Sequence, residues 1–184
     1  MALFHIVTGV VKLYTTFLDG KQHIMSFSFP DDLIGMAQNG THVGSAEALT
    51  PVTAYRMSMA AVSARLRSDP DLEFHLICQL SHELHQARYH ATLLSRHRAM
   101  ARIGLFLQML EANQNAREVS SREMYLPMTR SDIGAYVGIS LEAVGRSFRR
   151  LANRGAITIR NRRYIQITNR AEFEAAILDE SGRN

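Results

Sequence analysis

The chain of 184 residues contains a single cysteine, Cys78, and this scarcity limits its chemistry. One thiol cannot form an internal disulfide, and it cannot supply the four thiolates that a four-iron cluster needs within one subunit. We expect Cys78 to be a small apolar residue buried on a helix. The sequence therefore predicts no disulfide framework and no iron–sulfur cofactor held by one chain.

Features of membrane proteins and enzymes are also absent. The sequence has no run of some 18 apolar residues, no charged region and cleavage pattern of a secretory signal, no nucleophile motif and no glycine-rich phosphate loop. We expect a cytoplasmic protein that has no membrane partner and is not an enzyme. The histidines show no H-x-H spacing, and at helical spacing histidine is more often solvated or packed than a metal ligand, so we expect no metal site.

Residues 128–154, MTRSDIGAYVGISLEAVGRSFRRLANR, predict two short helices joined by a tight turn. Thr129 is a suitable N-cap with Asp132 three residues further on, and Gly138 interrupts the apolar pattern. Ser140 then caps a second helix. Its apolar positions recur at three, four and three residues: Leu141, Val144, Phe148 and Leu151. The pattern indicates a helix-turn-helix.

The polar face of the second helix carries Glu142, Arg146 and Arg149. An arginine can bind O6 and N7 of guanine with both arms of its guanidinium, and a glutamate can accept from the amino group of cytosine. Glu142 and Arg146 stack one turn apart near the helix N-terminus, where a major-groove helix meets base edges. The alternative is a surface helix with a weak i, i+4 salt bridge.

Charge distinguishes these interpretations. Residues 129–163 contain eight Arg, one Asp and one Glu, a balance of +6, whereas the whole chain carries +4. The rest of the chain is therefore net acidic. The chain has nineteen Arg and two Lys, and this overall preference for arginine does not by itself indicate phosphate binding. The clustering of arginines in residues 129–163 favours a phosphate-binding surface.

A β-hairpin is predicted after the second helix. Gly155 is a plausible C-cap, and the segment AITIRNRRYIQIT that follows it alternates apolar and polar residues on both sides of a basic turn at Asn161. Such a hairpin is typical of the wing of a winged helix-turn-helix. Arg162 and Arg163 at its tip would reach phosphates, or they belong to a turn kept soluble by charge.

The segment MTRSDIGAYVGISLEAVGR resembles the helix-turn-helix signature of the CRP/FNR superfamily of transcription regulators, with the FNR and FixK branches most similar. The resemblance continues through LFHIVTGVVKLY and FPDDLIG and covers nearly the whole chain. It implies an α+β fold with a partial β jelly-roll sensor domain in residues 1–70, a dimerisation helix in residues 71–98 and a winged helix-turn-helix domain in residues 99–184. Double-stranded DNA and RNA polymerase are the implied partners.

The resemblance implies base contacts from Glu142 and Arg146. Leu141 stands where CRP-type proteins carry an additional Arg, and Gly145 replaces the Ser usual in the FNR branch. We therefore expect a TTGAT-like half-site with partner ATCAA rather than TGTGA. In place of the guanine contact made by that Arg, Leu141 could contact a thymine methyl. Expected phosphate contacts come from Arg130, Ser140, Arg149, Arg162 and Arg163.

The sensor region, residues 3–60, is expected to form short strands with turns at Asp19-Gly20 and Pro30-Asp31. The family's jelly roll begins some strands earlier, so either the start codon is assigned too late or the sensor is shortened, with exposed edges. The nucleotide pocket of the CRP branch uses a Glu after the glycine of IGE and an Arg-Ser pair. Here Met36 stands in place of that Glu, and Gly44, just before Ser45, stands in place of the Arg. We therefore expect no cyclic AMP binding.

Residues 71–98 are expected to form a long helix with a heptad seam, which predicts a homodimer. The alternative is a helix packed on its own domain. The seam consists of Ile77, Leu80, Leu84, Ala87, Ala91 and Leu94.

Three functions remain open. The first is a FixK-type regulator controlled by its own abundance. The second is a haem-dependent, nitric-oxide-responsive regulator, whose axial ligand the sequence does not identify. The third is a truncated interaction module that pairs with a full-length relative and blocks it.

Overall fold

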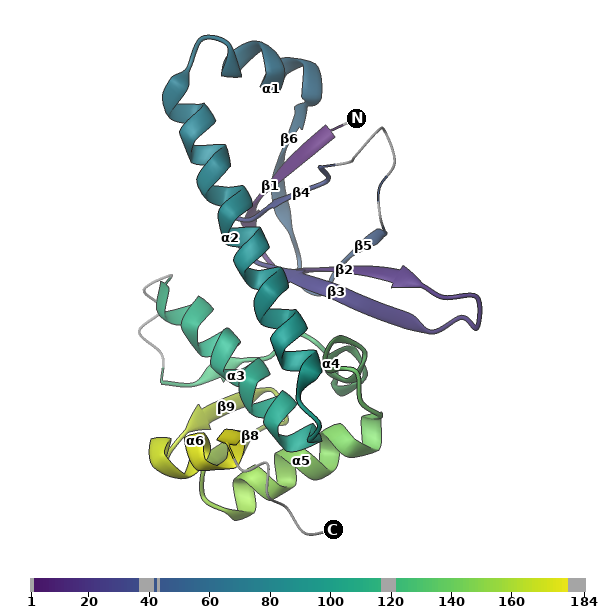
Figure 1. Ribbon diagram of the computed structural model, residues 1–184, viewed down its shortest axis with the longest axis vertical. Helices are drawn as coiled ribbons and strands as arrows, with labels where there is room; N and C mark the ends of the chain where they lie inside the picture. The colour runs from purple at the N-terminus through teal and green to yellow at the C-terminus, as the bar shows by residue number, and fades with distance from the viewer. Residues whose placement is uncertain (1, 37–41, 43, 117–121, 179–184) are drawn as a thin grey trace. The chain divides into compact units, whose positions relative to one another are not determined.

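The computed structural model describes residues 2–36, 42, 44–116 and 122–178 (Figure 1). Residues 179–184 of the expected C-terminal domain lie outside the described part. The chain divides into two compact units, Met1–Arg88 and Tyr89–Asn184, which are described separately. Helices combined with antiparallel sheets confirm the α+β class.

In the described residues of the first unit, the strands form two three-stranded antiparallel sheets. One has the order β4-β1-β6 and the other the order β3-β2-β5. The strands are β1 (Ala2–Thr8), β2 (Val11–Thr16), β3 (Gln22–Ser28), β4 (Leu33–Ile34), β5 (Ser45–Ala48) and β6 (Thr53–Ser58). The core of this unit includes Leu3, Ile6, Val11, Ile24 and Phe27. Burial does not follow a strict two-residue alternation in β1 and β3, and the pairings of both strands contain register shifts.

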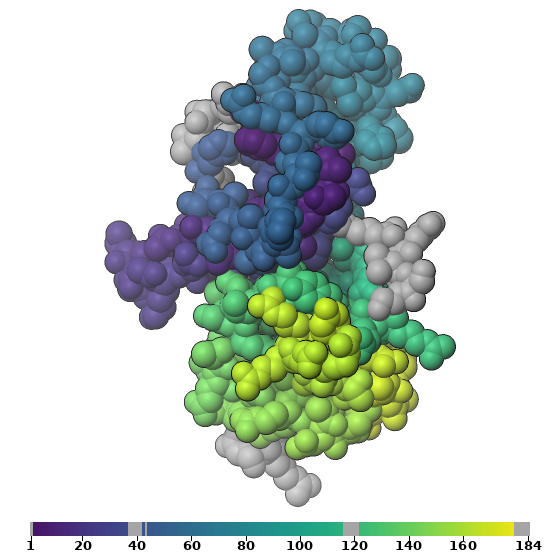
Figure 2. All heavy atoms as spheres, turned by 180° about the vertical axis from the view of Figure 1, so that it is seen from behind, coloured from purple at the N-terminus to yellow at the C-terminus, as the bar shows by residue number. Residues whose placement is uncertain are grey.

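The predicted hairpin at Asp19-Gly20 is confirmed. Gly20 has a φ of 77°, and the side chain of Asp19 accepts a hydrogen bond from the backbone of Lys21 at 3.0 Å. The β2–β3 hairpin projects from the rest of the first unit in both views (Figures 1 and 2). Its tip exposes the apolar side chains of Phe17 and Leu18.

Two helices follow the sheets. Helix α1 (Met59–Leu66) is capped by Ser58, and α2 extends from Pro70 to Ser95. The expected range of 71–98 was wrong at its end, because Arg96 N–H turns back to the carbonyl of Leu93 at 3.2 Å and closes the last turn. Among the residues that the structure describes, no helix combines the length and the apolar character needed to cross a bilayer.

One face of α2 is exposed within this chain. Phe74, Ile77, Leu80 and Leu84 are 68%, 56%, 45% and 52% exposed. Ala87 and Ala91 are exposed as well, whereas Leu94 is half-buried. Cys78 is exposed, so the prediction that it is buried was wrong. The prediction rested on the usual burial of a free cysteine, which does not show which face of a helix the fold covers.

In the part of the second unit that the structure describes, four helices follow α2 and pack with a small sheet. Its elements after α2 are α3 (Ala99–Ala116), β7 (Met124–Tyr125), α4 (Arg130–Val137), α5 (Leu141–Asn153), β8 (Ile157–Arg160), β9 (Tyr164–Ile167) and α6 (Arg170–Leu178), with sheet order β7-β9-β8. The fully buried core includes Ile103, Phe106, Ile133, Leu151, Ile165 and Phe173.

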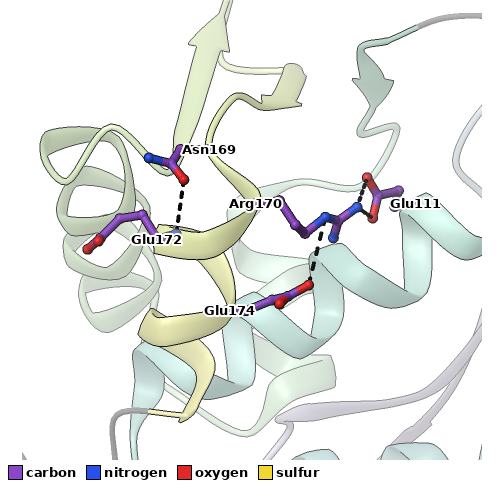
Figure 3. Close-up of polar contacts among 5 residues, drawn as sticks. All are labelled: Glu111, Asn169, Arg170, Glu172 and Glu174. Carbon is purple, nitrogen blue, oxygen red and sulfur yellow. Dashed lines mark hydrogen bonds and ion pairs between the residues drawn. The ribbon is translucent and has the colours of Figure 1, made fainter.

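Helix α6 was not predicted from the sequence. It is held to α3 by Arg170, whose Nη2 donates to both carboxylate oxygens of Glu111 at 2.8 and 2.7 Å (Figure 3). Asn169 caps the helix by accepting from the backbone of Glu172 at 3.1 Å. A Cβ at Gly104 would lie 2.4 Å from Ile177, so the glycine permits the close approach of α3 and α6.

Candidate nucleic-acid interface

The helix-turn-helix begins with the predicted capping box. Thr129 Oγ1 accepts from the backbone of Asp132 at 3.1 Å, and the Asp132 carboxylate accepts from the backbone of Thr129 at 2.8 Å. Helix α4 ends at Gly138, whose φ of 68° is left-handed and favours glycine. A Cβ at Gly134 would lie 2.8 Å from the carbonyl oxygen of Ile139, so this tight turn also requires a glycine inside α4.

Helix α5 begins at Ser140 as predicted. The Ser140 hydroxyl accepts from the backbone of Ala143 at 3.2 Å. The C-cap of the helix is Arg154, one residue before the predicted Gly155, and Gly155 follows it with a φ of 70°. Gly155 N–H bonds the carbonyl of Ala152 at 2.9 Å and Ala156 N–H that of Leu151 at 3.1 Å, which is a Schellman motif.

The two faces of α5 differ sharply. Val144, Phe148 and Leu151 are buried as predicted. Leu141 is 60% exposed, so its assignment to the apolar face was wrong: the first residue of the helix lies at the edge of the core. Ser147, which sequence reasoning missed, is buried and donates to the carbonyl of Ala143 at 2.8 Å.

The exposed face presents the side chains expected to read bases. Arg146 donates to the carboxylate of Glu142 one turn earlier, and both residues are exposed. A Cβ at Gly145 would meet no atom within 4 Å, so open space surrounds this position. Leu141 shares the exposed N-terminal end of the helix. The four predicted base-contact positions therefore face away from the core together.

The predicted hairpin follows α5. Strands β8 and β9 pair in the register Ile157↔Ile167 and Ile159↔Ile165. Asn161 and Arg162 have φ values of 49° and 59°, a pattern typical of a type I′ turn, which matches the twist of a tight hairpin. Arg162 is exposed at the tip.

Two further arginines of the hairpin, Arg163 and Arg160, connect it to preceding segments of the chain. Arg163 Nη1 donates to the carbonyl of Pro127 at 3.2 Å, so this side chain also ties the hairpin to the segment before α4. Arg160, at the end of β8, pairs with Glu123 at 2.6 Å and lies 4.2 Å from the Tyr164 ring centre. Its guanidinium lowers the pKa of the Glu123 carboxyl. Sequence reasoning missed this link between the hairpin and the segment before β7.

Arg130 occupies a more enclosed position than expected for a phosphate ligand. Its guanidinium lies 3.4 Å from the centre of the Phe148 ring, and Nη2 donates to the carbonyl of Arg162 at 3.4 Å. Burial lowers the pKa of Arg130 to about 10, which still leaves it charged at neutral pH. Arg130 thus links α4, α5 and the hairpin.

The exposed surface of α5 and the hairpin is strongly basic. The exposed arginines on these elements and at the end of α5 are Arg146, Arg149, Arg150, Arg154, Arg160, Arg162 and Arg163. A capped helix with such a face, beside a hairpin with a basic tip, has the shape and charge to enter a DNA major groove while contacting phosphates. Of the predicted phosphate contacts, Arg149, Arg162 and Arg163 are exposed, and Ser140 serves as a cap. Arg130 is half-buried, and both Arg130 and Arg163 also hold the fold together.

The sensor positions lie in the first unit. Gly35 has a φ of 93°, and the Met36 side chain after it is 49% exposed. Ser45 is exposed in β5. Residues 37–41 and 43, which separate these positions, lie outside the described residues. No group of three or more His, Cys, Asp or Glu side chains suited to a metal ion occurs in the described part of the chain.

Comparison with known proteins agrees with this geometry. Residues 1–69 match the cyclic nucleotide-binding domain and residues 101–176 match the Crp-like helix-turn-helix domain. The nitrogen fixation regulation protein FixK of Bradyrhizobium diazoefficiens is 34% identical over 158 residues, 86% of this chain and 67% of that protein. An anaerobic regulatory protein of Aggregatibacter actinomycetemcomitans is 31% identical over 185 residues, 100% of this chain and 70% of its own length.

A solved structure shares the fold over almost the whole chain. FixK2 from Bradyrhizobium japonicum superimposes with a TM-score of 0.85 at 29% identity and covers 95% of this chain and 86% of its own. The resemblance inferred from MTRSDIGAYVGISLEAVGR is thereby confirmed. The chain belongs to the CRP/FNR superfamily of DNA-binding transcription regulators and is FixK/FNR-like.

Proposed function

We propose that this regulator binds an inverted repeat of TTGAT-like half-sites as a homodimer. The observation that carries the proposal is the exposed Glu142–Arg146 pair at the N-terminal end of a helix capped at both ends. Arg146 can bind guanine O6 and N7, and Glu142 can accept from the cytosine amino group, so the pair suits a G·C step. With Leu141 in place of a second arginine, an additional guanine contact is lost, which favours TTGAT over TGTGA.

The homodimer is supported by the exposed stripe on α2. Ile77, Leu80 and Leu84 are about half exposed and recur at heptad spacing. A second copy would cover this stripe, and exposed Ala87 and Ala91 would permit close approach of the helices. A two-fold dimer presents two recognition helices about 34 Å apart, one turn of DNA, and so requires an inverted repeat.

We infer that binding needs neither an iron–sulfur cluster nor cyclic AMP. The one cysteine cannot hold a four-iron cluster within a subunit, and Met36 and Gly44 lack the polar groups that would anchor a nucleotide. Regulation in the cytoplasm would then follow the abundance of the protein, with RNA polymerase as its partner at the promoter.

A selection of binding sites from random duplexes by the purified chain tests the proposal. We expect inverted repeats of TTGAT and ATCAA, enriched equally by protein prepared with and without added cyclic AMP. Recovery of TGTGA repeats would show that the recognition face is assigned wrongly. Recovery of single half-sites would contradict the homodimer.

A further inference from the structure

The backbone carbonyls of the last two residues of α4, Tyr136 and Val137, and of its C-cap Gly138 all accept hydrogen bonds from side chains outside the helix-turn-helix. His90 Nε2 lies 2.8 Å from the carbonyl oxygen of Tyr136, and since a carbonyl only accepts, this nitrogen donates. Arg102 Nη1 donates to the carbonyls of Val137 and Gly138, each at 3.0 Å. The last carbonyls of a helix have no partner within it, so these contacts satisfy groups that water would otherwise solvate.

The donors come from the elements that precede the DNA-binding fold. His90 lies in the last turns of α2, is 8% exposed, and stacks on the Tyr136 ring with centres 4.0 Å apart and planes at 3°. Arg102 lies in the first turn of α3. Its Nε donates to the carbonyl of Arg96, just after α2, at 2.7 Å. One guanidinium therefore binds both the end of α2 and the end of α4.

Gly138 shows how closely these parts approach. A Cβ at this position would lie 3.1 Å from Arg102 Nη1 and 3.2 Å from Leu94 Cδ2. The turn of the helix-turn-helix thus packs directly against the last turn of α2. A positive side chain beside a helix C-terminus is also favoured by the helix dipole, which adds to the hydrogen bonds of Arg102.

We propose that His90 and Arg102 form a clamp that fixes the recognition helix to the last turns of α2 and thereby sets the half-site spacing that the dimer accepts. The proposal rests on the proposed homodimer. Both residues act as positioning residues, because they bind the carbonyls of α4. With the clamp closed, each α5 keeps one orientation relative to the last turns of its own α2, which carry Ala91 of the expected seam, so two copies paired there would hold their recognition helices at one separation.

Binding to DNA of altered spacing tests the clamp. The full chain is titrated with the matched inverted repeat, with repeats lengthened or shortened by one base pair, and with a single half-site. His90→Leu and Arg102→Met remove the donors while keeping apolar bulk. His90→Gln and Arg102→Lys retain a donor, and Arg67→Gln, at the exposed C-cap of α1, is the matched control.

For the wild type and Arg67→Gln, one inserted base pair should weaken binding on the order of 100-fold, because simultaneous engagement of both half-sites is lost. His90→Leu and Arg102→Met should reduce this penalty to about 10-fold or less and leave single half-site affinity within about threefold. His90→Gln and Arg102→Lys should restore part of the penalty. General destabilisation would instead weaken binding to every duplex alike.

Each result decides between the two proposals. A wild type indifferent to spacing overturns the homodimeric function and the clamp with it. If the wild type discriminates between spacings and natively folded clamp variants discriminate equally, the clamp alone is overturned. The clamp is also overturned if its variants lose as much affinity for the single half-site as for the full repeat. Circular dichroism melting identifies unfolded variants. If Arg102→Met does not fold, His90→Leu and His90→Gln decide the outcome.

Discussion

The guanidinium of Arg130 lies 3.4 Å from the centre of the Phe148 ring. This cation–π contact joins the first helix of the helix-turn-helix to the buried face of the second. The same side chain donates to the carbonyl of Arg162 in the hairpin tip. The elements expected to contact DNA are thus held together at one residue.

The first prediction concerns the stability of this junction. Arg130→Gln should lower the free energy of unfolding by about 1 kcal/mol, because a partly desolvated cation–π contact of this kind is worth roughly that much. Arg130→Lys keeps the charge without the planar stack and should lose less. Urea denaturation measures both variants. Unchanged stability of Arg130→Gln would show that the contact with Phe148 does not stabilise the fold.

The second prediction concerns base recognition. Arg146→Ala should weaken binding to the matched site by about 1 to 3 kcal/mol and flatten the preference at its G·C pair, since the bidentate guanine contact is lost. Arg149→Ala, on the same helix, should weaken all sequences alike. Titration against duplexes substituted at each position of the half-site separates the two effects. An unchanged G·C preference in Arg146→Ala would assign base reading elsewhere.

The third prediction uses the left-handed backbone of Arg162, whose φ is 59°. Arg162→Gly and Arg162→Ala remove the same charge, so each should reduce the slope of log K against log salt by about 1. Glycine adopts this conformation without strain, so Arg162→Gly should be about 1 kcal/mol more stable than Arg162→Ala. Salt titrations and thermal melting measure these changes. A changed sequence preference would contradict a phosphate contact.

The helix-turn-helix was predictable because its boundaries are set by neighbouring residues. Thr129 with Asp132, the turn at Gly138 and the cap at Ser140 each act within a few positions of the chain. The contacts of Arg130, His90 and Arg102 join residues far apart in sequence, so no local pattern contained them. Leu141 and Cys78 were misassigned for a related reason. The apolar spacing of Leu141 and the usual burial of a free cysteine favoured covered positions, but only packing determines whether a helix face is covered.

The fourth prediction concerns assembly. Leu84 lies in the middle of the exposed stripe of α2 and is 52% exposed in the single chain. Burying this side chain in both copies would contribute about 1.5 to 3 kcal/mol per copy, and Leu84→Glu would place two like charges against each other. Sedimentation should show a monomer. As a control, Asp71→Asn in the exposed first turn of α2, outside the heptad register of the seam, should leave the dimer intact. A Leu84→Glu protein that remains dimeric at micromolar concentration would contradict this seam.

The fifth prediction concerns oxygen. Since one chain lacks the thiolates for a four-iron cluster, affinity for the inverted repeat should be equal in air and under anaerobic conditions when a thiol reductant is present. Exposed Cys78 is the one thiol that air can oxidise, and it lies next to Ile77 of the expected seam. A change in air that reductant reverses and Cys78→Ser abolishes would therefore report thiol oxidation. A change that persists in Cys78→Ser, together with stoichiometric iron and sulfide, would show that a cluster is bound after all.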